Sequence, residues 1–295
     1  MKLLQLAIAA TITTGLIGWI ATDVAARTMI QNKGSDTLVN VAQAWAEAYQ
    51  KVKPDVAVAV TGGGSGTGIA AMINGTVDLA NSSRAMKEKE IAEANKNNIK
   101  PMEHLVGYDA LAIFVHKSNP MTSITLAQLA DMYGDDGKTE NWSQLGVKVP
   151  GCQGNKIVLI SRQNNSGTYI YFQEAVLGEK RDFRLGTKDL HGSKDVIDLV
   201  EKTPCAVGYS GLAYDSPHVK KLPVAKDDKA TPVEATMANA VSKLYPIARP
   251  LFMYTNGEPQ GDVKAYLDWI KSDIGQCITE EKGYAPIRPI NCAKK

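Results

Sequence analysis

The fold is decided by residues 156–172, which read KIVLISRQNNSGTYIYF. A short run of apolar, β-branched residues leads into a polar turn and then an aromatic-rich helical pattern, which predicts a strand, a loop and a helix. Ser166 stands at the N-cap, where the first backbone N–H groups of the helix have no intrahelical partner. Such a helix start suits an anion, and Arg162 at the strand end offers a planar fork of donors to the same point. The alternative is an ordinary capped helix beside a surface arginine.

Three other segments place hydroxyl groups or glycines between a strand pattern and a helix pattern. Taken singly, each also fits a plain helix cap or a flexible glycine turn. Four such loops in one chain are a stronger signal, because together they could surround a single anion with hydroxyls and backbone N–H groups. The three are GSDTL at residues 34–38, TGGGSGTG at residues 61–68 and NSSR at residues 81–84.

The glycine-rich loop at residues 61–68 does not match the familiar phosphate or catalytic motifs. It has no Lys-Ser or Lys-Thr ending, so it is not a P-loop, and its glycines do not form G-x-G-x-x-G. Thr67 stands two residues after Ser65, where a nucleophile elbow needs glycine. Phosphate or another small anion is the natural ligand of such a loop.

Length and charge set limits on the rest of the chain. The 295 residues suit two domains of ordinary size, each with its own core. A hydrophobic content of 44% and a charged content of 22% are normal for a soluble globular protein. The formal net charge is only +2, which gives no general attraction for nucleic acid or an anionic membrane. Any anion site must therefore be local.

The first 26 residues have the pattern of a signal peptide. Lys2 precedes an apolar run over residues 3–21, and the small residues Val24, Ala25 and Ala26 fit a cleavage site. The run is long enough that an uncleaved anchor is the alternative. No cysteine lies near the cleavage point, which argues against a lipid anchor. The sequence therefore predicts an exported protein.

Four cysteines in an oxidising compartment predict two disulfide bonds. Four residues allow three pairings, and we favour Cys277 with Cys292, which closes a short loop, and Cys152 with Cys205, which stand in loops. Metal binding is the weaker interpretation, because there is no C-x-x-C and the histidines are scattered.

The remaining elements follow from periodicity. Two long extended segments, at residues 105–116 and 244–254, suit strands that pass from one domain to the other, and prolines oppose a helix in the second. Thr125 opens a helix over residues 124–133, and we expect Trp142 in a local core. The other predictions are strands at residues 28–33, 55–60, 75–81 and 206–209, helices from about residue 37 and over 86–96 and 263–274, a charged helix-like stretch at 178–203, and an extended tail from residue 284.

These features together resemble the periplasmic phosphate-binding proteins of ABC uptake systems. The most specific part is the pattern Arg-x-x-x-Ser-Gly-Thr at residues 162–168, and the resemblance covers nearly the whole chain after the signal sequence. The segments that carry it occur in this order: GSDTL at 34–38, GGGSGTG at 62–68, VDLANSSR at 77–84, RQNNSGT at 162–168 and YPIARPL at 245–251.

The resemblance implies an α/β, two-lobed periplasmic-binding-protein type II fold with two hinge crossovers. We place the crossovers near residues 105–108 and 244–248. The first lobe is then discontinuous, comprising residues 27–106 plus 247–295, and the second lobe comprises residues 107–246. The anion would lie in the cleft between the lobes.

The resemblance also implies which residues bind inorganic phosphate. The first lobe would use hydroxyls and the start of a helix, and the second lobe would use the arginine and the helix start that follows it. The expected set is Thr37, Leu38, Ser65 and Ser83 from the first lobe and Arg162, Ser166, Gly167 and Thr168 from the second, with Ser35, Asp36, Gly66 and Arg84 as secondary candidates.

One position departs from the family pattern. Well-known members carry an aspartate in the third loop, which accepts a proton from phosphate and so rejects fully ionised sulfate. Ser83 occupies the matching position here. Asp36 could take over that role, or the anion selectivity could be looser.

The predicted mechanism is binding without chemistry, with no cofactor, no metal and no catalytic residue. A monomer in the periplasm would close around phosphate and be recognised by the permease subunits of an ABC transporter in the inner membrane. An adhesion or sensing role for the same fold remains an alternative. An exported serine hydrolase or phosphatase is disfavoured because the histidines lie outside the four loops, at His104, His116, His191 and His218.

Overall fold

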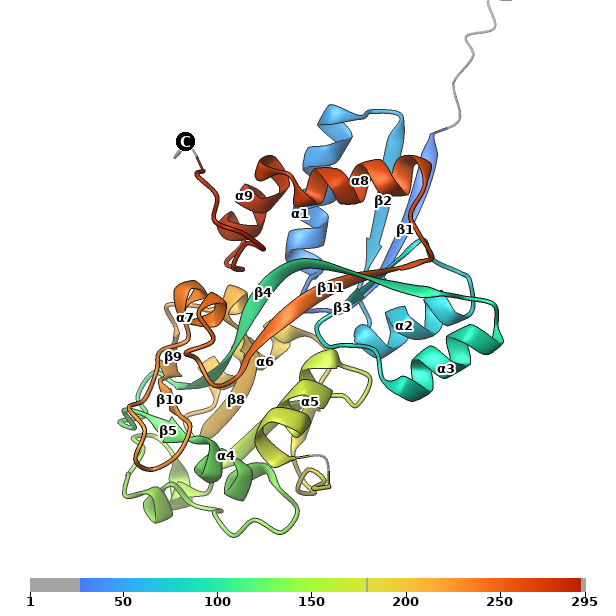
Figure 1. The fold of residues 1–295 in the computed structure, drawn as a ribbon. Helices are drawn as coiled ribbons and strands as arrows, with labels where there is room; N and C mark the ends of the chain where they lie inside the picture. The colour runs from blue at the N-terminus through green and yellow to red at the C-terminus, as the bar shows by residue number, and fades with distance from the viewer. Residues whose placement is uncertain (1–26, 179, 293–295) are drawn as a thin grey trace, which may run out of the picture.

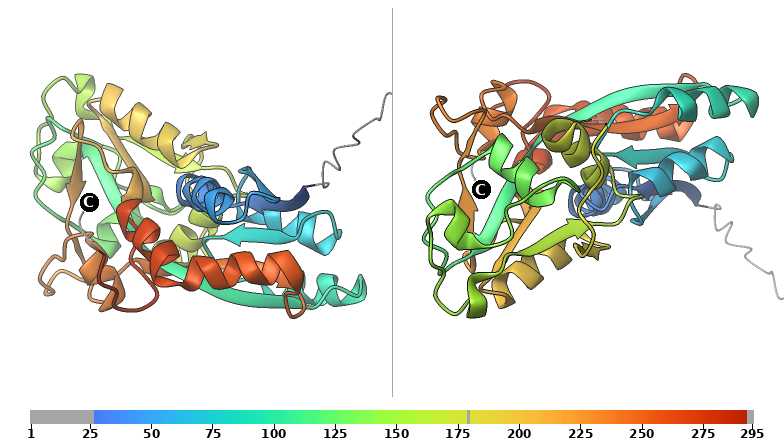
Figure 2. Two further views of the ribbon diagram at one scale, coloured as in Figure 1. Left: turned by 90° about the horizontal axis from the view of Figure 1, so that it is seen from above. Right: turned by 90° about the horizontal axis from the view of Figure 1, so that it is seen from below.

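Two long neighbouring strands, β4 (Pro101–His116) and β11 (Ala248–Asn256), run through the molecule and join two α/β halves (Figure 1). The computed structural model describes residues 27–178 and 180–292, so the predicted signal peptide lies outside the described residues. Across those two ranges no helix combines the length and apolar character needed to cross a membrane. The further views show β4 continuing from one half into the other (Figure 2).

The strands form a nine-stranded sheet within the described residues, in the order β2-β1-β3-β11-β4-β8-β6-β7, with β9 also paired to β4. On each side of the crossing strands the outer strands are parallel to one another, whereas β4 and β11 are antiparallel to each other and to β8 and β3. The outer strands are β1 (Thr28–Gly34), β2 (Val56–Thr61), β3 (Leu79–Ser82), β6 (Val158–Arg162), β7 (Lys188–Leu190), β8 (Ala206–Gly211) and β9 (Val219–Leu222).

Helices cover both halves of the sheet (Figure 1). The half that we call the first half carries α1 (Val39–Val52), α2 (Ser65–Ile73), α3 (Glu88–Lys96), α8 (Gly261–Lys271) and α9 (Asp273–Glu281). The second half carries α4 (Leu126–Tyr133), α5 (Gly167–Phe172), α6 (Ser193–Lys202), α7 (Met237–Val241) and a small second sheet of β5 (Ile124–Thr125) and β10 (Val224–Ala225).

The buried apolar residues divide in the same way. One core cluster of the second half draws on residues between Ala110 and Ile247, including the fully buried Trp142. Two clusters of the first half combine residues up to Val106 with residues from Leu251 onward. The chain therefore leaves the first half along β4 and returns to it along β11.

Two sequence predictions are wrong in detail. The stretch at 178–203 is not one helix, because Gly178 and Gly186 adopt φ values of +82° and +90°, which a helix does not contain. Among the described residues of this stretch only those of α6 are helical, and β7 precedes it. Residues 244–247 form a turn rather than the start of the second long strand, which begins at Ala248.

The C-terminal region contains a helix that periodicity did not predict. Ser272 has an extended backbone, ends α8, and caps α9 by accepting a hydrogen bond from the Gly275 N–H. The sequence predicts a single helix over residues 263–274 because the apolar pattern runs on through this break.

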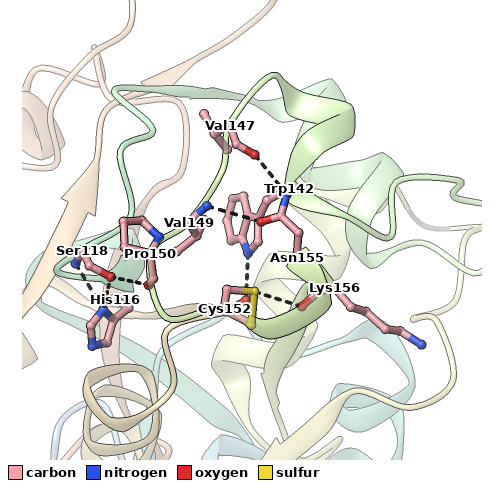
Figure 3. The surroundings of a disulfide bond; sticks show 10 residues. His116, Ser118, Trp142, Val147, Val149, Pro150, Cys152, Asn155 and Lys156 are labelled. Atoms are coloured by element: carbon pink, nitrogen blue, oxygen red, sulfur yellow. Dashed lines mark hydrogen bonds between the residues drawn. A yellow bond between two sulfur atoms is a disulfide. The ribbon is translucent and has the colours of Figure 1, made fainter.

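Both favoured disulfides are present. Cys152 and Cys205 lie 2.02 Å apart at sulfur, and they tie the loop before β6 to the loop before its parallel neighbour β8. Figure 3 shows Cys152 beside Trp142, whose indole N–H donates to the backbone oxygen of Cys205 at 2.9 Å. Cys277 and Cys292 close a loop of sequence separation 15 at the C-terminus.

Candidate functional site

The four loops found in the sequence meet at one point. The Thr37 and Thr168 hydroxyl oxygens are 3.0 Å apart. The Ser83 hydroxyl lies 3.3 Å from that of Ser65 and accepts from that of Ser35 at 3.0 Å. All five residues are buried. We call these five side chains the hydroxyl cluster, and Thr168 is its member from the second half.

Sheet topology explains why these loops converge. β2, β1 and β3 are parallel neighbours, and a cluster loop follows the carboxyl end of each. In the second half the loop before α5 follows β6 in the same way. Carboxyl ends of parallel strands meet along one edge of a sheet, which is where open α/β sheets bind ligands.

The loops of the two halves are in direct contact. An added Cβ at Gly167 would lie 2.2 Å from the Ser65 hydroxyl and 2.7 Å from that of Ser83. The Gly66 N–H donates across the same boundary to the Asn165 carbonyl oxygen at 2.9 Å. Glycine is therefore required at position 167 for the halves to approach this closely.

Two backbone N–H groups that the sequence predicts as free donors, those of Thr168 and Leu38, hydrogen-bond to neighbouring residues of their own loops. Ser166 caps α5, as predicted, by accepting from the Thr168 N–H at 3.2 Å. The Leu38 N–H, predicted as a free donor, binds the Ser35 carbonyl oxygen at 3.0 Å, because the chain makes a turn there and α1 begins one residue later. These backbone groups line the boundary between the halves without facing solvent.

Arg162 is buried but makes no hydrogen bond to the hydroxyl cluster. Its guanidinium donates to the Ser193 hydroxyl at 2.9 Å and the His191 carbonyl oxygen at 3.2 Å, both in its own half. It also donates to the Asp36 carboxylate of the first half at 3.1 Å. Burial lowers the pKa of Arg162, while Asp36 acts in the opposite direction. Arg162 thus links the two halves by an ion pair.

Asp36 has several partners besides Arg162. Its second carboxylate oxygen accepts from the Gly63 N–H at 2.8 Å, and the Tyr214 phenol donates to its backbone oxygen at 2.6 Å. Burial raises the pKa of Tyr214, so that phenol is a neutral donor from the second half. Both halves therefore hold Asp36 in place.

Arg84 points away from the cluster. Its guanidinium donates to both carboxylate oxygens of Glu90, at 2.8 and 2.7 Å, and to the Ala85 carbonyl oxygen at 2.9 Å. Burial acts to raise the pKa of Glu90, but the hydrogen bonds from Arg84 and from the Lys87 N–H, together with the charges of both residues, outweigh it and the pKa is lowered. Arg84 therefore stabilises the start of α3 and lies outside the candidate site.

The sequence prediction missed a second buried arginine, Arg249 on β11. One terminal nitrogen of Arg249 donates to the Thr168 hydroxyl at 3.1 Å and the Ser83 carbonyl oxygen at 3.3 Å. The other donates to the Thr37 hydroxyl at 3.3 Å and to the Asp109 carboxylate at 2.8 Å. Asp109 and Arg249 are charged residues beside the apolar runs of β4 and β11. A charged residue within a buried strand is uncommon, and this is the sequence signal that could have revealed the Arg249–Asp109 pair.

The arrangement suits anion binding rather than catalysis. Hydroxyls and helix starts can donate to a negatively charged guest, and the two buried guanidinium groups add positive charge nearby. Within residues 27–178 and 180–292 no group of His, Cys, Asp and Glu side chains could hold a metal ion. Three histidines bond elsewhere and so do not activate a cluster hydroxyl: His104 to Thr255, His116 to Ser118 and His191 to Gln163.

Residues 21–273 match the family model described as a PBP superfamily domain. The match spans most of the chain, so the protein belongs to this superfamily and has its α/β two-lobed fold, as the sequence predicts.

Individual relatives narrow the assignment. The chain is 34% identical over 277 residues to a protein of Pseudomonas aeruginosa named phosphate-binding protein PstS, covering 90% of this chain and 85% of the relative. It is 30% identical to the Bacillus subtilis protein of the same name, covering 86% and 79%. The chain therefore belongs to the PstS family of phosphate-binding proteins, which are not enzymes.

A solved structure agrees with this family. A Clostridium perfringens protein, described as a putative phosphate ABC transporter substrate-binding protein with bound phosphate, aligns with a TM-score of 0.78 at 29% identity. The alignment covers 88% of this chain and 100% of that one. The family and the fold predicted from the sequence are thus confirmed, and family membership implies an exported binding protein.

Proposed function

We propose that the mature chain binds inorganic phosphate between its two halves and delivers it to the permease subunits of an ABC transporter. The observation that carries this proposal is the meeting of Thr37, Ser65 and Ser83 with Thr168 across the boundary between the halves. The relatives named for phosphate binding, and the related structure with bound phosphate, support phosphate as the anion. The protein would act as a monomer in the periplasm, after removal of residues 1–26.

The halves act as two lobes in this proposal. The first lobe comprises residues 27–106 plus 247–295, and the second comprises residues 107–246. The division of the buried clusters along β4 and β11 supports these boundaries, because each lobe then has its own apolar core, although Ile247 packs in the core of the second lobe. Two crossing strands between independent cores allow the lobes to rotate with little loss of packing.

Phosphate binding would stabilise the closed arrangement. The cluster hydroxyls and the helix starts donate to the anion from both sides, and each hydrogen bond to a charged group contributes about 1.5–3 kcal/mol. Phosphate then shifts the population toward the closed form, since only that form presents both sets of donors. The proposed contacts are Thr37, Leu38, Ser65, Ser83, Ser166, Gly167 and Thr168, with Arg162 adding positive charge from the second lobe and Ser35, Asp36 and Gly66 at the margin.

Ser83 bears on the choice of anion. A serine hydroxyl both donates and accepts, so it does not repel a fully ionised oxyanion as a carboxylate does. We therefore expect sulfate to be rejected less strongly than in relatives with aspartate at this position. Asp36 limits that tolerance if it faces the anion once Arg162 shifts.

A thermal-shift titration with phosphate and sulfate in parallel tests the function. A ligand at one hundred times its Kd stabilises the fold by about 2.7 kcal/mol, which raises the melting temperature. Phosphate should produce this shift at the lower concentration, and sodium chloride at matched ionic strength serves as the control. A melting temperature that phosphate leaves unchanged at millimolar concentration would contradict the proposal.

A further inference from the structure

Arg249 and Asp109 form a buried charge pair where the two crossing strands meet. The two residues stand directly opposite each other in the ladder between β11 and β4. Both side chains are 0% exposed. Asp109 binds two guanidinium nitrogens, and its other oxygen accepts from the Leu212 N–H at 3.1 Å. The pair is therefore a fixed dipole on the two central strands of the sheet, which both halves share.

The positive end of this dipole faces the hydroxyl cluster. The guanidinium donates to the hydroxyl oxygens of Thr37 and Thr168, which come from opposite halves. A hydroxyl that accepts from a cation must direct its own hydrogen elsewhere. In this structure one of the two hydroxyls donates to the other at 3.0 Å. Because Arg249 occupies an acceptor position on each oxygen, both hydrogens can turn toward an anion that enters between the halves, and the charge of Arg249 strengthens them as donors.

Arg162 is less suited to this task. Its donors are engaged by Ser193, by the His191 carbonyl oxygen and by Asp36, and none of them orients a cluster hydroxyl. Of the two buried arginines, Arg249 has the contacts that order the binding groups.

We propose that Arg249 is a specificity-determining positioning residue of the anion site, which acts through Thr37 and Thr168, with Asp109 as its counter-ion. This inference rests on the proposed phosphate function and deepens it. Since the dipole presents its positive end to the ligand, it favours dibasic over monobasic phosphate. Affinity should therefore rise with pH through the second ionisation of phosphate.

The groups around Arg249 do not obscure this pH effect. They are Asp109, the Tyr171 ring at 5.6 Å, Arg162 and Tyr284. Burial raises the pKa values of Tyr171, Tyr284 and Tyr245, which faces Asp109, so none of these phenols ionises near neutral pH. Burial also raises the pKa of Asp109, while the charge and hydrogen bonds of Arg249 act in the opposite direction; Arg249→Lys keeps this carboxyl and so controls for it. The change in phosphate affinity between about pH 6 and pH 8 then reports mainly the charge of phosphate itself.

The test compares wild type with the double variant Asp109→Asn/Arg249→Gln. This variant removes the dipole without leaving one buried charge unpaired, which would destabilise the fold. We expect phosphate affinity to fall about 10- to 100-fold, the range for losing charge-assisted hydrogen bonds. We also expect the rise of affinity with pH to flatten. Calorimetry at several pH values measures both, and the melting temperature without phosphate measures folding.

Two further variants complete the test. Lys53→Gln/Asp262→Asn removes a charge pair between the residue that follows α1 and a residue of α8, outside the site, and should keep the wild-type affinity and pH profile. Arg249→Lys keeps the charge beside Asp109, but one ammonium does not reproduce the fork, so affinity should fall about tenfold. If the double variant does not fold, Arg249→Lys alone tests whether Arg249 contributes to phosphate affinity.

The outcomes separate this inference from the function it rests on. If wild type binds phosphate and Thr37→Val weakens binding, but both Arg249 variants keep the wild-type affinity and pH profile, the role of Arg249 is overturned and the function stands. A lower melting temperature with a wild-type pH profile would show a purely structural pair and would also overturn it. If wild type does not bind phosphate, the proposed function is wrong, and the inference about Arg249 that rests on it is wrong as well.

Discussion

The two buried arginine–aspartate pairs of this protein differ in what they join. Arg162 and Asp36 connect residues of opposite halves at 3.1 Å, whereas Arg249 and Asp109 connect the two crossing strands at 2.8 Å. Separation of the halves would break the first pair and leave the second intact. If the halves open as proposed, the first pair exists in the closed form alone, whereas the second remains in both forms.

Exposure also separates the pairs. The Asp36 side chain keeps 12% of its surface accessible, whereas both members of the other pair have none. When either aspartate is lost, the group left behind is an arginine. Arg162 lies at the boundary and regains water once the halves separate, but Arg249 stays buried on the crossing strands. Loss of one partner should thus cost little in the first pair and much in the second.

The largest expected effect is therefore on stability, in Asp109→Ala. Arg249 would remain buried without its counter-ion, which typically costs about 3–5 kcal/mol. Urea denaturation of the unliganded protein measures this loss. The matched variant Asp36→Ala should lose far less, and equal losses in the two variants would show that the pairs do not differ as described.

The second largest effect is expected on phosphate binding, in Gly167→Ala. The added methyl group would lie 2.2 Å from the Ser65 hydroxyl, and overpacking of this kind costs about 1–3 kcal/mol. Because the clash exists only when the halves are closed, we expect phosphate affinity to fall about 5- to 100-fold. Calorimetry measures the affinity, and a wild-type value would mean that the halves do not close this tightly around the anion.

Asp36→Asn should have the smallest effect. The amide oxygen still accepts from the Gly63 N–H, but the amide NH2 replaces the oxygen that accepts from Arg162, so the charge and that one hydrogen bond are lost. Because the cost of desolvating two nearly buried charges offsets much of their attraction, we expect a change of at most several-fold in phosphate affinity. The difference from wild type should shrink further as salt is added. A loss of a hundredfold would instead place Asp36 in direct contact with the anion.

Much of the site could be predicted from sequence because its signals are local. Glycine and serine at a helix start follow from hydrogen-bonding needs of a few neighbouring residues, as at Ser166 and Gly167. The convergence of the loops follows from the parallel strands that precede them.

The features that the sequence did not predict depend on contacts between residues far apart in the chain. The role of Arg249 requires the register that sets it opposite Asp109, which no local pattern supplies. The saturation of Arg162 by the His191 carbonyl oxygen and by Ser193 likewise depends on the path of the chain after β7. The same limit explains the error at residues 178–203, where charged composition suggested a helix but Gly178 and Gly186 interrupt it.

The most direct test of the central claim is small-angle X-ray scattering of residues 27–295 with and without saturating phosphate. If an anion held by both halves favours the closed form, the radius of gyration should fall when phosphate is added, and sodium chloride at equal ionic strength should not reproduce the change. An unchanged radius in a sample that binds phosphate by calorimetry would contradict capture by closure.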